Sequence, residues 1–160
     1  MTVVVARILV EVDDLLVPAR DLADAIVAAL PGWVERCVDR TYRAWTGAPP
    51  ADVIAAARAA GAAAAADTGA RVRTLLETDI DDQRTTPLAL VREAVSYPTE
   101  VLAAAGVPPV ERDRVDRVMF PDDAYALSPA NFAAVDPRLA GLALTWGAAK
   151  AWVHRRRHAS

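Results

Sequence analysis

Residues 51–79 have the sequence ADVIAAARAAGAAAAADTGARVRTLLETD, and this stretch predicts the longest helix of the chain. Its centre is almost uncharged, and a small residue recurs there at every fourth position. A row of small residues lets a second helix approach closely, although each internal glycine costs about 1 kcal/mol relative to alanine. We expect an interaction face, whose partner helix lies in the same chain or in another copy. The row consists of Ala57, Gly61, Ala65 and Gly69.

Residues 2–17 have two interpretations. Arg7, Glu11 and Asp14 recur at the spacing of one helical stripe, with apolar residues off that stripe, which favours a helix. Many of the apolar residues are β-branched and favour a strand, so a strand is the alternative. These apolar residues are Val3, Val4, Ile8, Val12 and Leu15.

Proline and glycine divide residues 18–50 into two expected helices. Pro18 suits a first helical turn, where a missing N–H is harmless. We expect Pro31-Gly32 to break or sharply kink this helix, because a proline inside a helix removes a hydrogen bond and clashes with the preceding turn. The second helix is expected to end at Gly47 and Pro49-Pro50.

Further predicted helix boundaries follow residue 79. Thr85-Thr86-Pro87 combines a capping hydroxyl with a proline and predicts a helix start. Pro98 predicts a kink or restart, and Gly106 a stop. Pro108-Pro109 is expected to open a short helix that ends near Phe120.

The last part of the chain predicts short helical pieces and a terminal helix. Asp136 is expected to cap that helix and Pro137 to be its first residue. Its packing stripe consists of Leu139, Leu142, Trp146, Ala149 and Val153. Residues 1–160 therefore predict a single all-α domain, a compact bundle of about six to eight helices with short Pro/Gly-punctuated loops.

Composition limits the classes of partner and compartment. Hydrophobic residues make up 54% of the chain, which excludes intrinsic disorder, and a net charge of -3 gives no global attraction to nucleic acid or to an anionic membrane. Charges interrupt the apolar opening stretch before the roughly 20 residues that span a bilayer. A lone cysteine, Cys37, cannot form an internal disulfide. We expect a protein of the bacterial cytoplasm.

Two acidic clusters are candidate metal sites, because carboxylates bind hard cations. The spacing matches no calcium loop, and a run of acids in a loop is commonly solvated surface. We therefore expect solvated surface, with a metal or ligand site as the alternative. The clusters consist of Glu77, Asp79, Asp81 and Asp82, and of Asp122 and Asp123.

The C-terminal residues offer two further candidates. His154 and His158 are spaced to share a metal ion, but the three intervening arginines oppose the approach of a cation. Arg155, Arg156 and Arg157 can neutralise phosphates, which makes nucleic-acid binding an alternative function. The same cations also stabilise a helix C-terminus. A solvated tail is the interpretation we favour.

The sequence shows no catalytic motif and predicts no cofactor. Cys37 lies among apolar residues, which predicts a buried thiol with a raised pKa rather than a nucleophile. The tryptophans occur at helical spacings, which predicts core or interface positions. They are Trp33, Trp45, Trp146 and Trp152.

A series of motifs between about Arg84 and His154 resembles small uncharacterised helical proteins of actinobacteria. The motifs are Thr85-Thr86-Pro87, Tyr97-Pro98-Thr99, Gly106-Val107-Pro108-Pro109, Phe120-Pro121-Asp122-Asp123 and Trp146-Gly147-Ala148-Ala149-Lys150. The resemblance covers under half of the chain and consists mostly of helix punctuation. It implies a cytoplasmic helical protein and no functional residue.

The leading hypothesis from the sequence is a non-enzymatic protein that binds another protein, first of all a second copy of itself. The surface is expected to be the small-residue row of residues 57–69 or an exposed tryptophan. A small enzyme or a metal or ligand binder that uses the clustered acids is one alternative. Nucleic-acid binding through the arginine tail is the other.

Overall fold

The structure is a computed structural model that describes the chain apart from residues 1, 78–86, 130, 143 and 145–160. The described residues form helices and no strand, which confirms the all-α prediction. Residues 139–142 are helical as well. The helices are α1 (Thr2–Trp45), α2 (Ala51–Glu77), α3 (Pro87–Glu93), α4 (Ser96–Ala104), α5 (Arg114–Met119) and α6 (Phe132–Val135).

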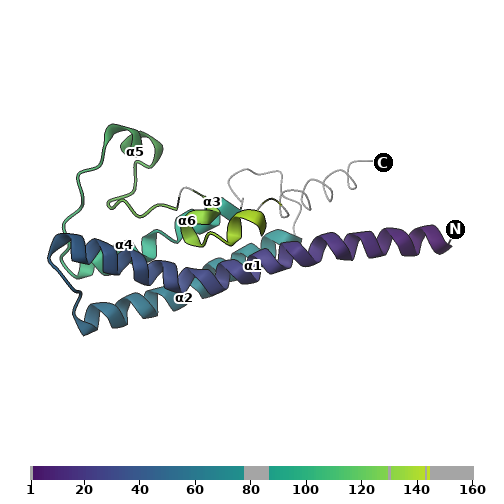
Figure 1. Cartoon of the computed structure of the whole chain (residues 1–160), viewed down its shortest axis with the longest axis horizontal. Coiled ribbons are helices and arrows are strands. Elements are labelled where there is room, and N and C mark those ends of the chain that lie inside the picture. Colours follow the sequence, from purple (N-terminus) through teal and green to yellow (C-terminus); the bar gives the residue numbers. More distant parts are fainter. Residues whose placement is uncertain (1, 78–86, 130, 143, 145–160) are drawn as a thin grey trace.

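The two long helices, α1 and α2, form an antiparallel hairpin (Figure 1). The shorter helices α3, α4 and α6 pack along this hairpin, and α5 stands away from it on a loop. The N-terminal part of α1 continues past the end of α2. Of the described helices, none is both long and apolar enough to cross a membrane.

Helix α1 corrects three predictions. Residues 2–17 are helical, so the strand alternative is wrong. The helix continues without a break through Pro18 and through Pro31-Gly32, and at 44 residues it is longer than α2. The predicted break at Pro31-Gly32 is therefore wrong, and so is the prediction that residues 51–79 form the longest helix.

Burial of apolar side chains explains why α1 continues as a helix through Pro31. A proline inside a helix costs about 3 kcal/mol, whereas each fully buried aliphatic side chain contributes about 1.5–3 kcal/mol. The stripe on both sides of Pro31 is fully buried, so its summed contribution exceeds the cost of the proline. The stripe consists of Leu22, Ile26, Leu30, Val34 and Val38.

The small-residue row of α2 packs inside this chain. Ala57, Gly61, Ala65 and Gly69 are all buried, and α2 makes its main contacts with α1. A Cβ atom added to Gly61 would lie 2.9 Å from the Cα of Pro31, so the two backbones approach closely there. The partner of the row is thus α1, and the row is not an accessible surface for another copy.

Helices α3 and α4 follow the predicted punctuation. α3 begins at Pro87, and a turn at residues 94–95 separates it from α4, which places Pro98 in the first turn of α4. At the end of α4, the amide of Gly106 donates to the carbonyl of Ala103 and the amide of Val107 to that of Leu102. Gly106 has a φ of 78°, the left-handed conformation that this C-terminal turn requires.

The next predicted boundary is wrong. The short helix begins at Arg114, not at Pro108-Pro109, because the Asp113 side chain accepts a hydrogen bond from the Asp116 amide and caps it. Asp136 accepts a hydrogen bond from the Arg138 amide ahead of helical residues 139–142, as expected of a cap. Of the predicted terminal stripe, Trp146, Ala149 and Val153 lie outside the described residues.

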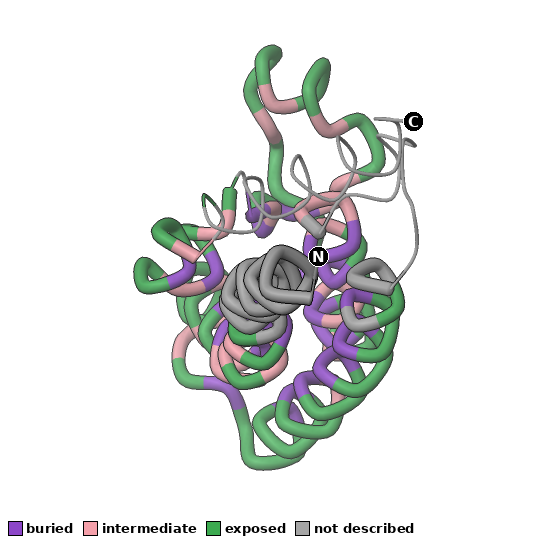
Figure 2. Tube along the Cα trace, turned by 90° about the vertical axis from the view of Figure 1, so that its right-hand side faces the viewer, coloured by how far each residue is buried: buried purple, intermediate pink, exposed green. Residues whose placement is uncertain are grey.

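The core lies along the inner faces of the hairpin and of the helices packed on it (Figure 2). The tube around α5 is coloured as exposed or intermediate, and α5 contains no buried residue. The fold therefore consists of a well-packed helical body and one outlying element.

Candidate functional site

The outlying element is a loop, residues 108–123, that we call the arm. A single arginine closes it: the Arg112 guanidinium donates to the backbone carbonyls of Asp116 and Phe120, each at 2.6 Å, and to that of Asp123. Hydrogen bonds from a charged donor are stronger than neutral ones. The conformation of the arm is thus set by polar contacts within the arm itself.

Arg92 of α3 connects the arm to the body. Its guanidinium carbon lies 3.8 Å from the centre of the Phe120 ring, a cation–π contact. Its Nη2 atom lies 3.6 Å from Oδ2 of Asp123. Arg92 and Arg112 together hold the base of the arm.

The helix carried by this arm exposes apolar side chains. Val115 is 65% exposed, Val118 75% and Met119 62%. Their i, i+3, i+4 spacing places them on one stripe of α5. Arg114 and Arg117, both exposed, lie on the same helix, and Arg114 is one turn before Val118. The arm therefore presents an apolar stripe with guanidinium groups beside it.

A groove of about 360 Å³ lies where the arm leaves the body. One wall is the C-terminal end of α1, where Trp45 is 45% exposed and packs edge-on against Tyr42, with ring centres 5.4 Å apart. The other wall includes Pro108, Pro109 and Val110. The buried Tyr125 hydroxyl donates to the Val107 carbonyl at 2.7 Å and fixes the start of this wall. We call this hollow the Trp45 groove.

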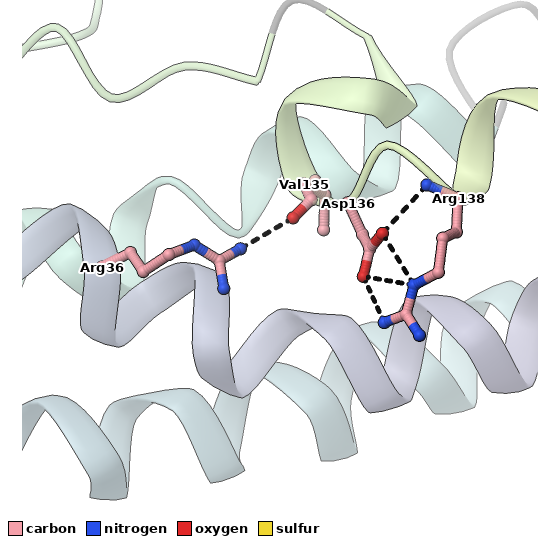
Figure 3. A network of polar contacts seen from close by, with 4 residues as sticks. All are labelled: Arg36, Val135, Asp136 and Arg138. Atoms are coloured by element: carbon pink, nitrogen blue, oxygen red, sulfur yellow. Dashed lines mark hydrogen bonds and ion pairs between the residues drawn. The ribbon is translucent and has the colours of Figure 1, made fainter.

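Most arginine side chains that the structure describes have a partner. Arg36 donates to the Val135 carbonyl at 2.9 Å and ties α6 to α1, and Arg138 binds Asp136 beside it (Figure 3). The Arg138 contacts lower the pKa of Asp136 to about 2. By contrast, no hydrogen bond or ion pair is found within the described residues for Arg40 at the groove or for Arg114 and Arg117 on α5.

The predicted acidic sites do not form a metal centre in the described part of the chain, where no group of three or more potential ligands converges. Asp122 is exposed, and Asp123 is paired with Arg92. Glu77 is the last residue of α2. Asp79, Asp81 and Asp82 lie outside the described residues.

The C-terminal candidates also lie outside the described residues: His154, His158, Arg155, Arg156, Arg157, Trp146 and Trp152. The two described tryptophans differ, because Trp33 is buried and Trp45 is exposed. Burial raises the pKa of the Cys37 thiol to about 11, against the opposing effect of Arg40 and Arg36. The burial of Cys37 agrees with the prediction of a buried thiol.

Two features of the candidate site were not predicted from the sequence. The apolar stripe of α5 has a visible helical spacing, but the sequence predicted only a short helix in this region and no exposed stripe. The closure by Arg112 has no sequence signal, because its acceptors are backbone carbonyls. Comparisons of the chain with family models, with curated proteins and with solved structures gave no match.

Proposed function

We propose that the chain is a protein-binding helical domain and that the α5 stripe is its contact surface. The observation that carries this proposal is the exposure of Val115, Val118 and Met119 on a helix without any buried residue. Burial of one such side chain contributes about 1.5–3 kcal/mol. The arm therefore leaves unused a binding energy that contact with a second molecule can recover.

The partner that fits is a protein with an apolar groove. Short amphipathic helices bind in this way, with anchors at i, i+3 and i+4. Arg114 and Arg117 have no partner among the described residues, so carboxylates at one edge of that groove would complement them. The Arg112 hydrogen bonds hold the arm in one conformation before it binds. Less conformational entropy is therefore lost on binding.

A second copy of the chain fits this stripe less well. A symmetric pair places the same surface on both sides of the contact, so Arg114 and Arg117 of the two copies would lie close together instead of facing complementary carboxylates. The small-residue row, the other route to self-association, is buried against α1. Size-exclusion chromatography with light scattering tests this point: we expect a monomer, and a dimer lost on Val118→Ser would identify the second copy as the partner.

Site-specific photo-cross-linking in the cells that make the protein tests the proposal. A photoreactive residue at position 118 is expected to capture one protein, and the same residue at Ala59, on the exposed side of α2, is expected to capture none. The captured protein, once purified, should bind the unmodified chain and lose about 10-fold in affinity on Val115→Ser.

Equal capture at positions 118 and 59 would contradict the proposal. Binding that is indifferent to Val115→Ser would contradict it as well. Either result would mean that the exposed stripe has no specific partner.

A further inference from the structure

The Trp45 groove is separate from the α5 stripe and has a different chemistry. Its apolar lining includes Trp45, Ala44 and the arm residues Pro108, Pro109 and Val110. Prolines have a fixed φ, and the Tyr125 hydrogen bond holds the preceding residue, so this wall is formed in advance. A ligand can therefore bind without first ordering this wall of the groove.

One charged residue lines this groove. Arg40 is the single charged residue among the groove-lining residues that the structure describes. The neighbouring charges on α1 are engaged elsewhere: Asp39 binds Arg43 at 2.8 Å, and Arg36 donates to the Val135 carbonyl. Cys37, beside Arg40, gives no compensating negative charge at pH 7, because burial raises its thiol pKa to about 11. Arg40 therefore offers the groove an uncompensated positive charge.

We infer that the Trp45 groove binds an acidic, extended segment of another polypeptide. An apolar or aromatic side chain of that segment packs on Trp45 and the prolines, while a carboxylate receives hydrogen bonds from the Arg40 guanidinium. A nucleic acid fits poorly, because a single guanidinium neutralises few phosphates and the whole chain carries a net charge of -3.

The exposure of the rim favours a polypeptide over a small carboxylic acid. Trp45 and Val110 remain 45% and 49% exposed, so the groove is open along its edge. Small ligands commonly bury about 70–90% of their surface. An extended chain can run along such an open groove and add contacts beyond it.

A peptide library provides the test. Random 12-residue peptides displayed on phage are selected on the immobilised full-length chain, and the enriched sequences are synthesised for fluorescence anisotropy. We expect enriched peptides that pair an acidic residue with a bulky apolar one. Both Arg40→Ala and Trp45→Ala should weaken their binding about 10-fold or more.

Arg43→Ala is the matched control, because Arg43 lies one turn further along α1, is exposed and is paired with Asp39. Arg43→Ala should leave the affinity for the peptides unchanged. Arg40→Lys should retain part of the affinity that Arg40→Ala loses. All the substituted side chains are exposed, so denaturation curves should match that of the unchanged chain.

Three results would overturn the inference. One is enrichment of peptides without acidic residues, or of none at all. Another is equal loss of affinity for Arg40→Ala and Arg43→Ala. The third is displacement of the peptides by octanoate at equal concentration, which would identify the groove as a site for small carboxylic acids. None of these results bears on the α5 stripe, which cross-linking tests separately.

Discussion

The hairpin and the arm are built in opposite ways. In the hairpin of α1 and α2, apolar and small residues lie inside, and paired charges such as Arg58 with Glu35 lie outside. In the arm, the guanidinium of Arg112 lies inside on backbone carbonyls, and the aliphatic side chains of α5 lie outside. Burial of apolar side chains accounts for the structure of the hairpin but not for that of the arm. An element that is braced by polar contacts and exposes its apolar stripe is the basis of the proposal that the arm contacts another molecule.

Removal of a core side chain of the hairpin should have the largest effect. Leu30 is fully buried, and Leu30→Ala is expected to lower the free energy of unfolding by about 2–5 kcal/mol. Urea denaturation measures this change. Ile54→Ala, on the exposed side of α2, is the control and should cost far less. Similar costs for the two variants would contradict the packing described for the hairpin.

Substitution at the close crossing of α1 and α2 should have the next largest effect. Gly61→Ala gains up to about 1 kcal/mol in helix propensity, but the new Cβ would lie 2.9 Å from the Cα of Pro31 and 3.1 Å from its carbonyl oxygen. Overpacking of this kind costs about 1–3 kcal/mol, so we expect a lower melting temperature.

Gly141→Ala is the control for this substitution. Gly141 is helical too, and an added Cβ there would meet no atom within 4 Å. This variant should be neutral or more stable. If Gly61→Ala stabilised the protein as well, the close approach of the two helices would be refuted.

Loss of the arm's closure should have a local effect. Arg112→Met removes three hydrogen bonds from a charged donor, and the Asp116 and Phe120 carbonyls keep only their bonds from the amides of Phe120 and Asp123. A hydrogen bond to a charged group contributes about 1.5–3 kcal/mol. Amide hydrogen exchange of residues 114–120 should accelerate at least 10-fold, while that of residues 22–38 stays constant. Arg114→Met, which removes an arginine without a described partner, should change neither segment. Uniform acceleration along the chain would show that the arm and the body are one cooperative unit.

Alkaline pH offers a smaller test of the hairpin core. The Cys37 pKa is 9.0 in an unfolded chain and about 11 in the folded protein. The unfolded state therefore releases its proton first, and stability should fall as the pH rises above 9.0. The decline should be shallower in Cys37→Ala, which has no thiol to ionise. Identical pH dependence in both proteins would place Cys37 in contact with water.

These two regions also differ in how far their sequences predict them. The helical spacing around Leu30, the helix start at Pro87 and the left-handed turn at Gly106 depend on local sequence, so the all-α fold follows from them. The break predicted at Pro31 does not occur, because the free-energy cost of a proline in a helix is smaller than the free energy gained by burying the side chains on both sides of it. The partner of Gly61 depends on which helix folds back, which a row of small residues does not specify.

The conformation of the arm could not be predicted from the sequence for a further reason. Arg112 binds carbonyls of residues 4 to 11 positions away, and such acceptors exist at every residue of any chain. The exposure of Val118 depends on the arm leaving the body, which a helical spacing alone does not indicate. The candidate site is therefore a property of the tertiary structure.

The central claim is that the α5 stripe contributes nothing to the stability of the chain that carries it. The most direct test is urea denaturation of the triple variant Val115→Ser, Val118→Ser, Met119→Gln. Exposed substitutions usually change stability by less than about 0.5 kcal/mol each, so the unfolding curve should nearly overlay that of the unchanged protein. A loss of several kcal/mol would mean that these side chains are buried within the body, and the account of the arm as a contact surface would be wrong.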